Sequence, residues 1–128
     1  MATYTKLEEL QVWRDARVLV AEIYDVMQTS GIKDDAGLFD QLNRASGSIM
    51  DNIAEGFGRM GNKEFILFLS YAQGSLYESK SQVYRAKDRN YIGEELLNEL
   101  ISNLEDVSKQ ITGFIKYLKS TEIRGNKY

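Results

Sequence analysis

Six residues near the middle of the chain, Gly56-Phe57-Gly58-Arg59-Met60-Gly61, match the Gly-x-Gly-x-x-Gly pattern whose backbone amides cradle a pyrophosphate. That chemistry needs a strand before the glycines and a helix amino end after them. Here the pattern follows a helical segment, and no strand-like alternation is near it. It therefore predicts a turn between two helices and not a nucleotide site.

The other side chains with chemical potential lack the partners that catalysis or metal binding requires. Asp51 and Glu55 are one helical turn apart, but metal sites in helical bundles combine carboxylates with His, and the chain has no His and no Cys. Ser46 and Ser48 have no candidate base. We expect an exposed or ion-paired carboxylate pair, small serines that allow close helix packing, no enzyme activity, no catalytic residue, no metal and no cofactor.

Composition indicates a single globular domain over residues 1–128, with 43% apolar and 27% charged residues and no Pro. The absence of Cys, a polar amino-terminal stretch and the lack of an apolar run of about 20 residues predict a cytoplasmic, bacterial-type protein without a membrane span. The net charge is −3 and the pI is near 5.0, which argues against a generic nucleic-acid coat.

Apolar residues recur every three or four positions in four segments, which predicts helices over about 6–29, 38–56, 62–89 and 94–119. The line with the clearest period, in the last segment, is Leu97, Leu100, Leu104, Val107, Ile111, Phe114 and Leu118. The connections between segments are short, so the expected fold is an all-α, antiparallel up-down-up-down four-helix bundle.

Residue types at the helix ends predict particular caps. Thr5-Lys6-Leu7-Glu8 has the form of a capping box, and Gly31 suits the left-handed position after a helix. Asp34 or Asp35 is the expected cap of the second helix, and Asn62 that of the third.

Several apolar residues lie outside the main apolar lines: Val12, Leu19, Val26, Ile101 and Ile115. They have two interpretations. They form a surface for a partner, most simply another copy of the chain, or the helices have wide buried faces that absorb them.

A polar line runs along the second helix: Gln41, Arg44, Ser48, Asn52 and Glu55. It is either a solvated flank or a partly buried row in which Arg44 and Glu55 pair with Glu78 or Gln82 of the third helix. A structural or interface role is favoured over a ligand site.

Positive charge gathers in two places. Residues 84–91 interleave aromatic and basic side chains as RNA-binding surfaces do, although cations are also favoured at a helix carboxyl end. In an up-down bundle the second group shares the opposite pole: Arg59, Lys63, Lys116, Lys119, Arg124 and Lys127. That pole is the candidate contact for nucleic acid.

The stretch from Gln41 to Arg59, with Asn52-Ile53-Ala54-Glu55-Gly56 at its centre, resembles the signature of a known family. This is the four-helix-bundle family of proteins encoded in 23S rRNA intervening sequences, which includes the accessory variability protein of diversity-generating retroelements. The similarity continues through residues 64–78, and residues 10–16 are similar to the family's opening helix.

The resemblance implies a bundle that assembles into a pentameric ring, and in the retroelement branch the ring is basic and binds nucleic acid and a reverse transcriptase. The motif positions carried by the resemblance, without a catalytic duty, are Gln41, Arg44, Ser48, Asn52, Glu55 and Gly56. This chain departs from the family in its acidic balance and in lacking Pro before the second helix.

Taken together, these features favour a non-enzymatic, homo-oligomeric scaffold that docks a protein or ribonucleoprotein partner. The alternative is a protein that binds RNA or DNA directly through the basic pole. No small-molecule substrate is indicated.

Overall fold

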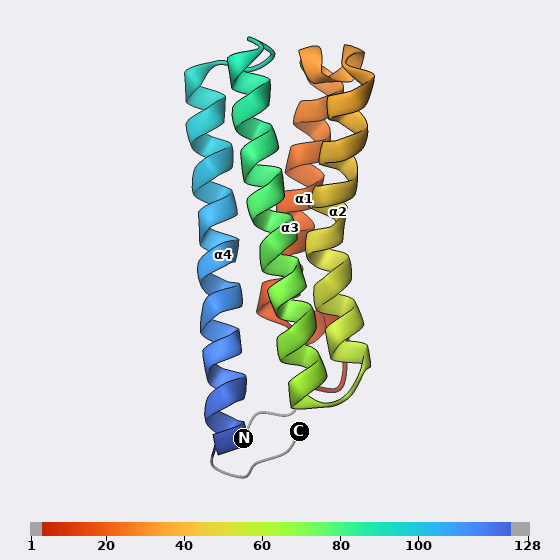
Figure 1. The fold of residues 1–128 in the computed structure, drawn as a ribbon, viewed down its shortest axis with the longest axis vertical. Coiled ribbons are helices and arrows are strands. Elements are labelled where there is room, and N and C mark those ends of the chain that lie inside the picture. Colours follow the sequence, from red (N-terminus) through yellow and green to blue (C-terminus); the bar gives the residue numbers. More distant parts are fainter. Residues whose placement is uncertain (1–3, 124–128) are drawn as a thin grey trace.

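A computed structural model describes residues 4–123 and shows four long helices with two short 3-10 helices (Figure 1). The elements are η1 (Leu7–Glu9), α1 (Gln11–Thr29), η2 (Gly31–Asp34), α2 (Ala36–Gly58), α3 (Asn62–Asp88) and α4 (Glu94–Ile123). No strand occurs within residues 4–123, so the predicted all-α class is confirmed.

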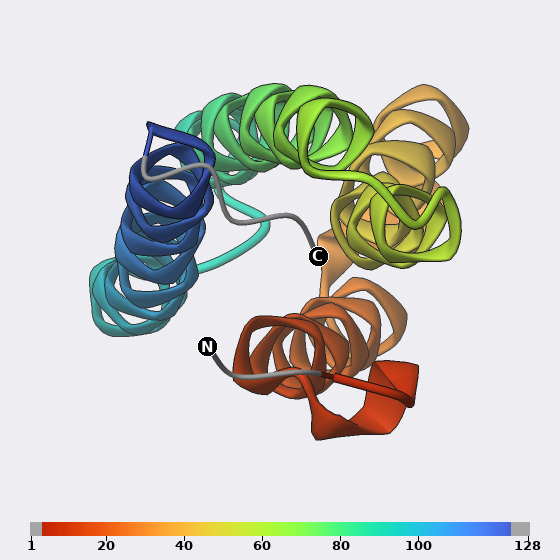
Figure 2. The ribbon, with the colours of Figure 1, turned by 90° about the horizontal axis from the view of Figure 1, so that it is seen from below.

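The helices alternate in direction along the bundle, as the short connections predict. Viewed along the bundle, α1, α2, α3 and α4 follow one another around a common core (Figure 2). α2 and α3 pack most extensively, and α1 and α4, which close the circle, pack least among the neighbouring helices. The bundle is therefore tightest along one seam and loosest along the opposite one.

The core is apolar along the whole bundle and takes up the wide helix faces. Val12, Leu19 and Val26 are buried, and Ile101 and Ile115 are half-buried against the core. Of the two interpretations open for these residues, the wide buried face is the one observed. They do not form a free surface on the described chain.

The start of α1 differs from the prediction. The α-helix begins at Gln11 and not at residue 6, and the carboxylate of Glu9, instead of Glu8, accepts hydrogen bonds from the Thr5 and Lys6 amides at 2.9 and 3.2 Å. Leu10 has an extended backbone and a fully buried side chain, and this extended residue separates η1 from α1. The burial of the Leu10 side chain therefore accompanies a break in the helix that was predicted to run from residue 6.

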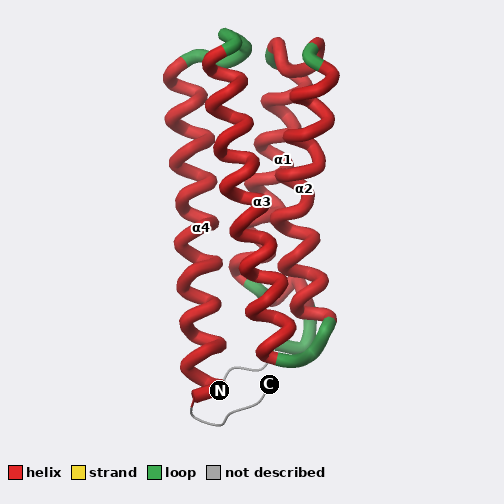
Figure 3. Tube along the Cα trace, viewed as in Figure 1, coloured by secondary structure: helices red, strands yellow, loops and turns green. Residues whose placement is uncertain are grey.

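The connection between α1 and α2 lies at the same end of the bundle as the connection between α3 and α4 (Figure 3). It is built on side-chain caps and a close contact. Asp35 caps α2, its Oδ1 accepting from the Leu38 amide at 3.2 Å, which settles the choice between the two predicted aspartates. Gly31 is not in the left-handed region. It is required because a Cβ there would lie 2.6 Å from Cδ1 of Tyr91.

Asn62 does not cap α3, contrary to the prediction. Gly61 is the residue before the helix, and the Asn62 amide donates to the Leu118 carbonyl and the Thr121 hydroxyl at 3.0 and 2.9 Å. The side chain therefore ties the start of α3 to the end of α4.

Candidate functional site

The polar line of α2 lies on the outer side of the helix. Gln41, Arg44 and Glu55 are exposed, while Ser48 and Asn52 are half-buried. The Asn52 amide donates to the carbonyl and hydroxyl oxygens of Ser48 at 2.8 and 2.9 Å. This flank is solvated, with its polar groups largely satisfied within the helix.

The cross-helix burial considered for Arg44 and Glu55 is not found. Arg44 pairs at 3.2 Å with Asp40, one turn earlier, and both side chains are mostly exposed. Glu55 pairs with Arg59 on the same helix end. Gln82, considered as a partner from α3, is buried without a hydrogen-bond partner for its Oε1 in the described residues.

Two other motif residues instead join α2 to α3. Oε1 of Gln41 accepts a hydrogen bond from Nη2 of Arg85. Gly56 is buried against α3, since a Cβ there would lie 2.8 Å from Cβ of Phe68 and 3.0 Å from Cδ1 of Phe65. These positions in the motif hold the tightest seam of the bundle together.

Arg59 is occupied by neighbouring groups. Its guanidinium pairs with Glu55 at 2.9 Å and Glu64 at 3.2 Å, and it lies 5.0 Å from the ring centroid of Phe68. The hydrogen bond to Glu55, followed by the charges of the two carboxylates, raises the pKa of Arg59. Two carboxylates thus outweigh its positive charge, so Arg59 adds little to a basic surface.

The remaining described members of the predicted basic pole are free cations at one end of the bundle. Lys63, Lys116 and Lys119 are exposed, and none of them takes part in an ion pair with the side chains of residues 4–121. The link from Asn62 brings the start of α3 to the end of α4, as Figure 1 also shows. Arg124 and Lys127 lie outside the described residues.

The basic group at residues 84–91 holds the other pole together. Arg89 and Tyr91 both donate to Oδ2 of Asp35, at 2.7 and 2.8 Å, and Lys87 is 3.7 Å from Glu94. These contacts lower the pKa of Asp35, with the Tyr91 hydrogen bond as the largest cause, and raise the pKa of Tyr91. Most of the positive charge in residues 84–91 is therefore paired with groups on other helices or at their ends.

The outer face of α3 carries an apolar stripe that the sequence analysis missed. Leu67, Tyr71, Tyr77 and Tyr84 are between 42% and 55% exposed. Steps of four and seven keep Leu67 with Tyr71 and Tyr77 with Tyr84, and the step of six turns about 120° between the two pairs, so the four residues follow a broad band on the outer side of the helix. The stripe was hidden by the stronger buried line of the same helix.

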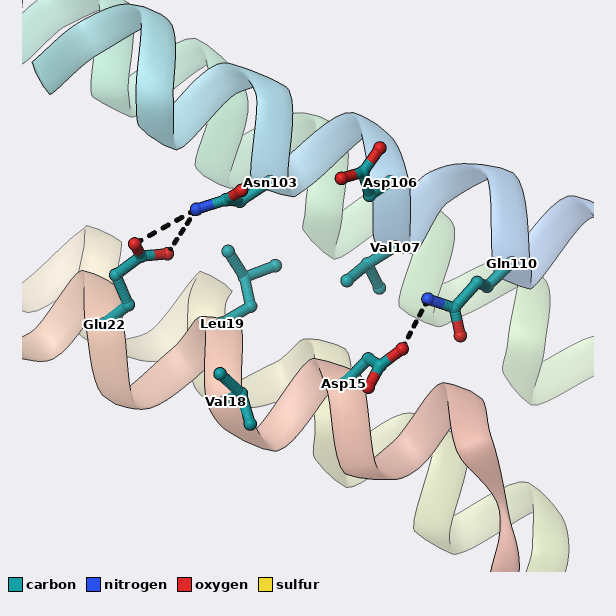
Figure 4. Close-up of a pocket in the computed structure, with 8 residues that line it drawn as sticks. All are labelled: Asp15, Val18, Leu19, Glu22, Asn103, Asp106, Val107 and Gln110. Atoms are coloured by element: carbon teal, nitrogen blue, oxygen red, sulfur yellow. Dashed lines mark hydrogen bonds between the residues drawn. The ribbon is translucent and has the colours of Figure 1, made fainter. Parts of the chain in front are cut away.

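A groove of about 610 Å³ lies between α1 and α4 (Figure 4). It is lined by Asp15, Val18, Leu19, Glu22, Asn103, Asp106, Val107 and Gln110. Asn103 donates to both oxygens of Glu22 at 2.8 and 3.0 Å, and Gln110 donates to Asp15 at 2.7 Å. The loosest seam of the bundle is thus bridged by amide–carboxylate hydrogen bonds.

The described residues show no group of three or more His, Cys, Asp or Glu side chains placed to hold a metal ion. In the same part of the chain, no helix is both long enough and apolar enough to cross a membrane. The polar features instead lie on outer helix faces, in an open groove and at the poles of an all-α bundle.

This architecture defines a four-helix-bundle protein. The family model of the 23S rRNA-intervening sequence protein matches residues 8–113, and the chain belongs to that family. It is also similar to a solved structure of a protein of unknown function from the S23 ribosomal protein family of Bacteroides thetaiotaomicron, with a TM-score of 0.74 and 18% identity over 82% of this chain and 95% of the other. No curated protein matches the sequence.

Proposed function

We propose that this chain is a non-enzymatic binding module that assembles with copies of itself and docks a protein or ribonucleoprotein partner. The observation that supports it is the outer face of α3, where Leu67, Tyr71, Tyr77 and Tyr84 are all about half exposed. Tyrosine is enriched at protein interfaces because its ring is apolar and its hydroxyl tolerates water. From Leu67 to Tyr84 the stripe runs about 25 Å along the helix.

The size of the stripe indicates what else the interface must include. An aromatic side chain buries about 150–250 Å² in full, so the three half-exposed tyrosines contribute roughly 300 Å² and Leu67 adds less. A stable interface takes about 800 Å² from each partner. The neighbouring outer face of α2, with Arg44, Ser48 and Asn52, is the nearest surface able to supply the rest. The resemblance to intervening-sequence proteins favours a closed ring, with five copies as the number to test.

Native mass measured by sedimentation velocity tests this assembly. We expect an oligomer at tens of micromolar for the unmodified chain and a monomer of unchanged helicity for the double variant Tyr71→Ser/Tyr77→Ser. Tyr24→Ser is the matched control, because Tyr24 is exposed to a similar degree on α1. A monomeric unmodified chain would contradict the proposal, as would a double variant that assembles normally.

The second candidate is direct binding of RNA or DNA through the pole that carries Lys63, Lys116 and Lys119. It is supported by the lack of ion pairs between these three exposed cations and the side chains of residues 4–121. The net charge of −3 and the occupied guanidinium of Arg59 weigh against it. For this reason the docking module is the preferred function.

Binding to a structured RNA hairpin across a salt series separates the two candidates. If Lys116 and Lys119 each contact one phosphate, reversing both charges should lower the slope of log K against log[salt] by up to about 2. The control is Lys33→Glu/Lys109→Glu, which makes the same change in net charge at exposed positions away from this pole. Equal losses in the two double variants, or no loss in either, would reject this placement.

A further inference from the structure

The groove between α1 and α4 combines an exposed apolar centre with a half-buried acidic rim. Val18 is 68% exposed, and Leu19 and Val107 lie buried beside it. Asp15 and Glu22 flank this centre on α1 and are half-buried. The exposed Val18 side chain therefore leaves apolar surface uncovered along the seam where the bundle packs least.

The carboxylates of the groove have no ion-pair partner among the described residues, and the nearest cations on α1, Arg14 and Arg17, line a separate hollow on the other side of Val18. No Lys or Arg is among the groove's lining residues, and none of the ion pairs between the side chains of residues 4–121 involves Asp15, Glu22 or Asp106. The amides of Asn103 and Gln110 orient two of these carboxylates but bring no charge. The contact between α3 and α4, by contrast, includes an ion pair between Lys80 and Glu105.

The length of the groove is suited to a helix. Asp15 and Glu22 are seven residues apart on α1, and so are Asn103 and Gln110 on α4, which makes each wall about 10 Å or two turns long. Side chains seven residues apart on a docked helix have the same repeat. Two roughly antiparallel helices also offer a trough for a third, since helices pack 8–10 Å apart.

We propose that this groove docks an amphipathic helix of a partner protein, with apolar side chains over Val18 and Lys or Arg side chains paired with Asp15, Glu22 and Asp106. The proposal rests on the docking function above and names the site and the chemistry of the partner. A groove two turns long buries less than a standard interface, so a single helix binds weakly. Charge complementarity selects basic helices over acidic ones.

The test uses a fluorescein-labelled synthetic helix of about 14 residues, with Leu at heptad spacing on one face and Lys on both flanks. Its binding to the full chain is measured by fluorescence anisotropy at low salt. The triple variant Asp15→Asn/Glu22→Gln/Asp106→Asn, which keeps the polar shape and removes the charge, should bind about tenfold more weakly. The same peptide with Glu in place of Lys should not bind.

The matched control is Asp51→Asn/Glu78→Gln/Asp88→Asn, which removes the same net charge from exposed positions on α2 and α3. It should change the affinity less than twofold, because those residues do not line the groove. Equal binding by the groove variant and the unmodified chain would overturn the proposal, and so would equal losses in the two triple variants.

Val18→Arg gives an independent readout that does not depend on removing hydrogen-bond acceptors. This exposed position places a cation of the chain's own among the three carboxylates, so the basic helix should lose its binding while the helix content is unchanged. Retained binding by this variant would also refute the site. Native mass is recorded for every variant. An intact oligomer with charge-independent peptide binding would reject the groove alone, whereas groove-dependent binding by a monomer would reject self-association alone.

Discussion

Replacing Gly56 by Ala tests whether the family motif fixes the distance between α2 and α3. The added Cβ would lie 2.8 Å from Cβ of Phe68, 3.0 Å from Cδ1 of Phe65 and 3.3 Å from the Phe65 carbonyl. Two of these three atoms are backbone or directly attached to it, so they move only if α3 moves. Relief of the contact therefore disturbs the most extensive packing in the molecule.

The expected magnitude is a difference between two opposing effects. Ala is better than Gly inside a helix by about 0.5–1 kcal/mol, because Gly loses more backbone freedom on folding. Overpacking a core contact costs about 1–3 kcal/mol. We therefore expect Gly56→Ala to lower the free energy of unfolding by about 1–2 kcal/mol, or Tm by about 3–8 °C for a chain of this size.

Gly47→Ala is the matched control on the same helix. A Cβ at Gly47 meets nothing within 4 Å, so only the helix propensity acts, and this variant should gain up to about 1 kcal/mol. Urea unfolding followed by circular dichroism gives both values. If Gly56→Ala proves as stable as Gly47→Ala, α2 and α3 are not held at the distance observed.

Three further changes probe other contacts. Asp35→Asn should flatten the loss of stability on acidification, because the pKa of Asp35 is lowered on folding. The contribution of Asp35 to stability is present above the unfolded-state pKa of about 4 and is lost as the pH falls through the lower folded-state pKa. Thermal unfolding between about pH 5 and 2.5 will measure this difference. Asn62→Ala removes both hydrogen bonds to the end of α4 and should destabilise the chain by about 1–2 kcal/mol, with amide exchange accelerated around Thr121; unchanged exchange there would argue against the tie. Leu76→Ala, at a fully buried position of α3, should cost about 2–5 kcal/mol in urea unfolding, and a smaller loss would mean that the core closes around the site.

Helix existence was predictable from the sequence because apolar periodicity is a local property. Residues 94–119 were predicted as a helix, and α4 (Glu94–Ile123) begins at the same residue. The antiparallel order followed from connections too short to cross the bundle. The family motif also marked Gly56, although its reason, contact with Phe68, needed the structure.

The predictions of helix ends that were wrong concerned residues whose contacts lie far away in the sequence or on a neighbouring turn. Asn62 has the type of a helix cap, yet its partners are 56 and 59 residues away on α4. Gly31 has the type of a left-handed stop, but it is small because Tyr91 packs against it. Glu9 replaced Glu8 because burial of Leu10 shifted the start of α1. Capping rules that use only the neighbouring sequence do not include such partners.

The groove was missed for a related reason. Val12, Leu19 and Val26 were recognised as an apolar line, and they are indeed buried. The residues beside that line, Asp15 and Glu22, have no distinctive pattern of their own. Only the spatial pairing of α1 with α4 brings the Asn103 and Gln110 amides to these carboxylates. Periodicity identifies a buried face but not the seam between two faces that remains open.

The positions of the proposed surfaces on the bundle lead to one more prediction. In Figure 2, α3 lies across the core from α1, so the tyrosine stripe and the α1–α4 groove lie on different sides of the molecule. Self-association through α3 would therefore leave every groove open, and an oligomer would present several weak sites at once.

Two basic helices joined by a flexible linker should then bind the oligomer at least about 10²-fold more tightly than one helix, provided that the linker spans two grooves. The monomeric variant Tyr71→Ser/Tyr77→Ser, with one groove, should gain little from the second helix. Equal gains for the oligomer and the monomer would show that the two surfaces do not act together.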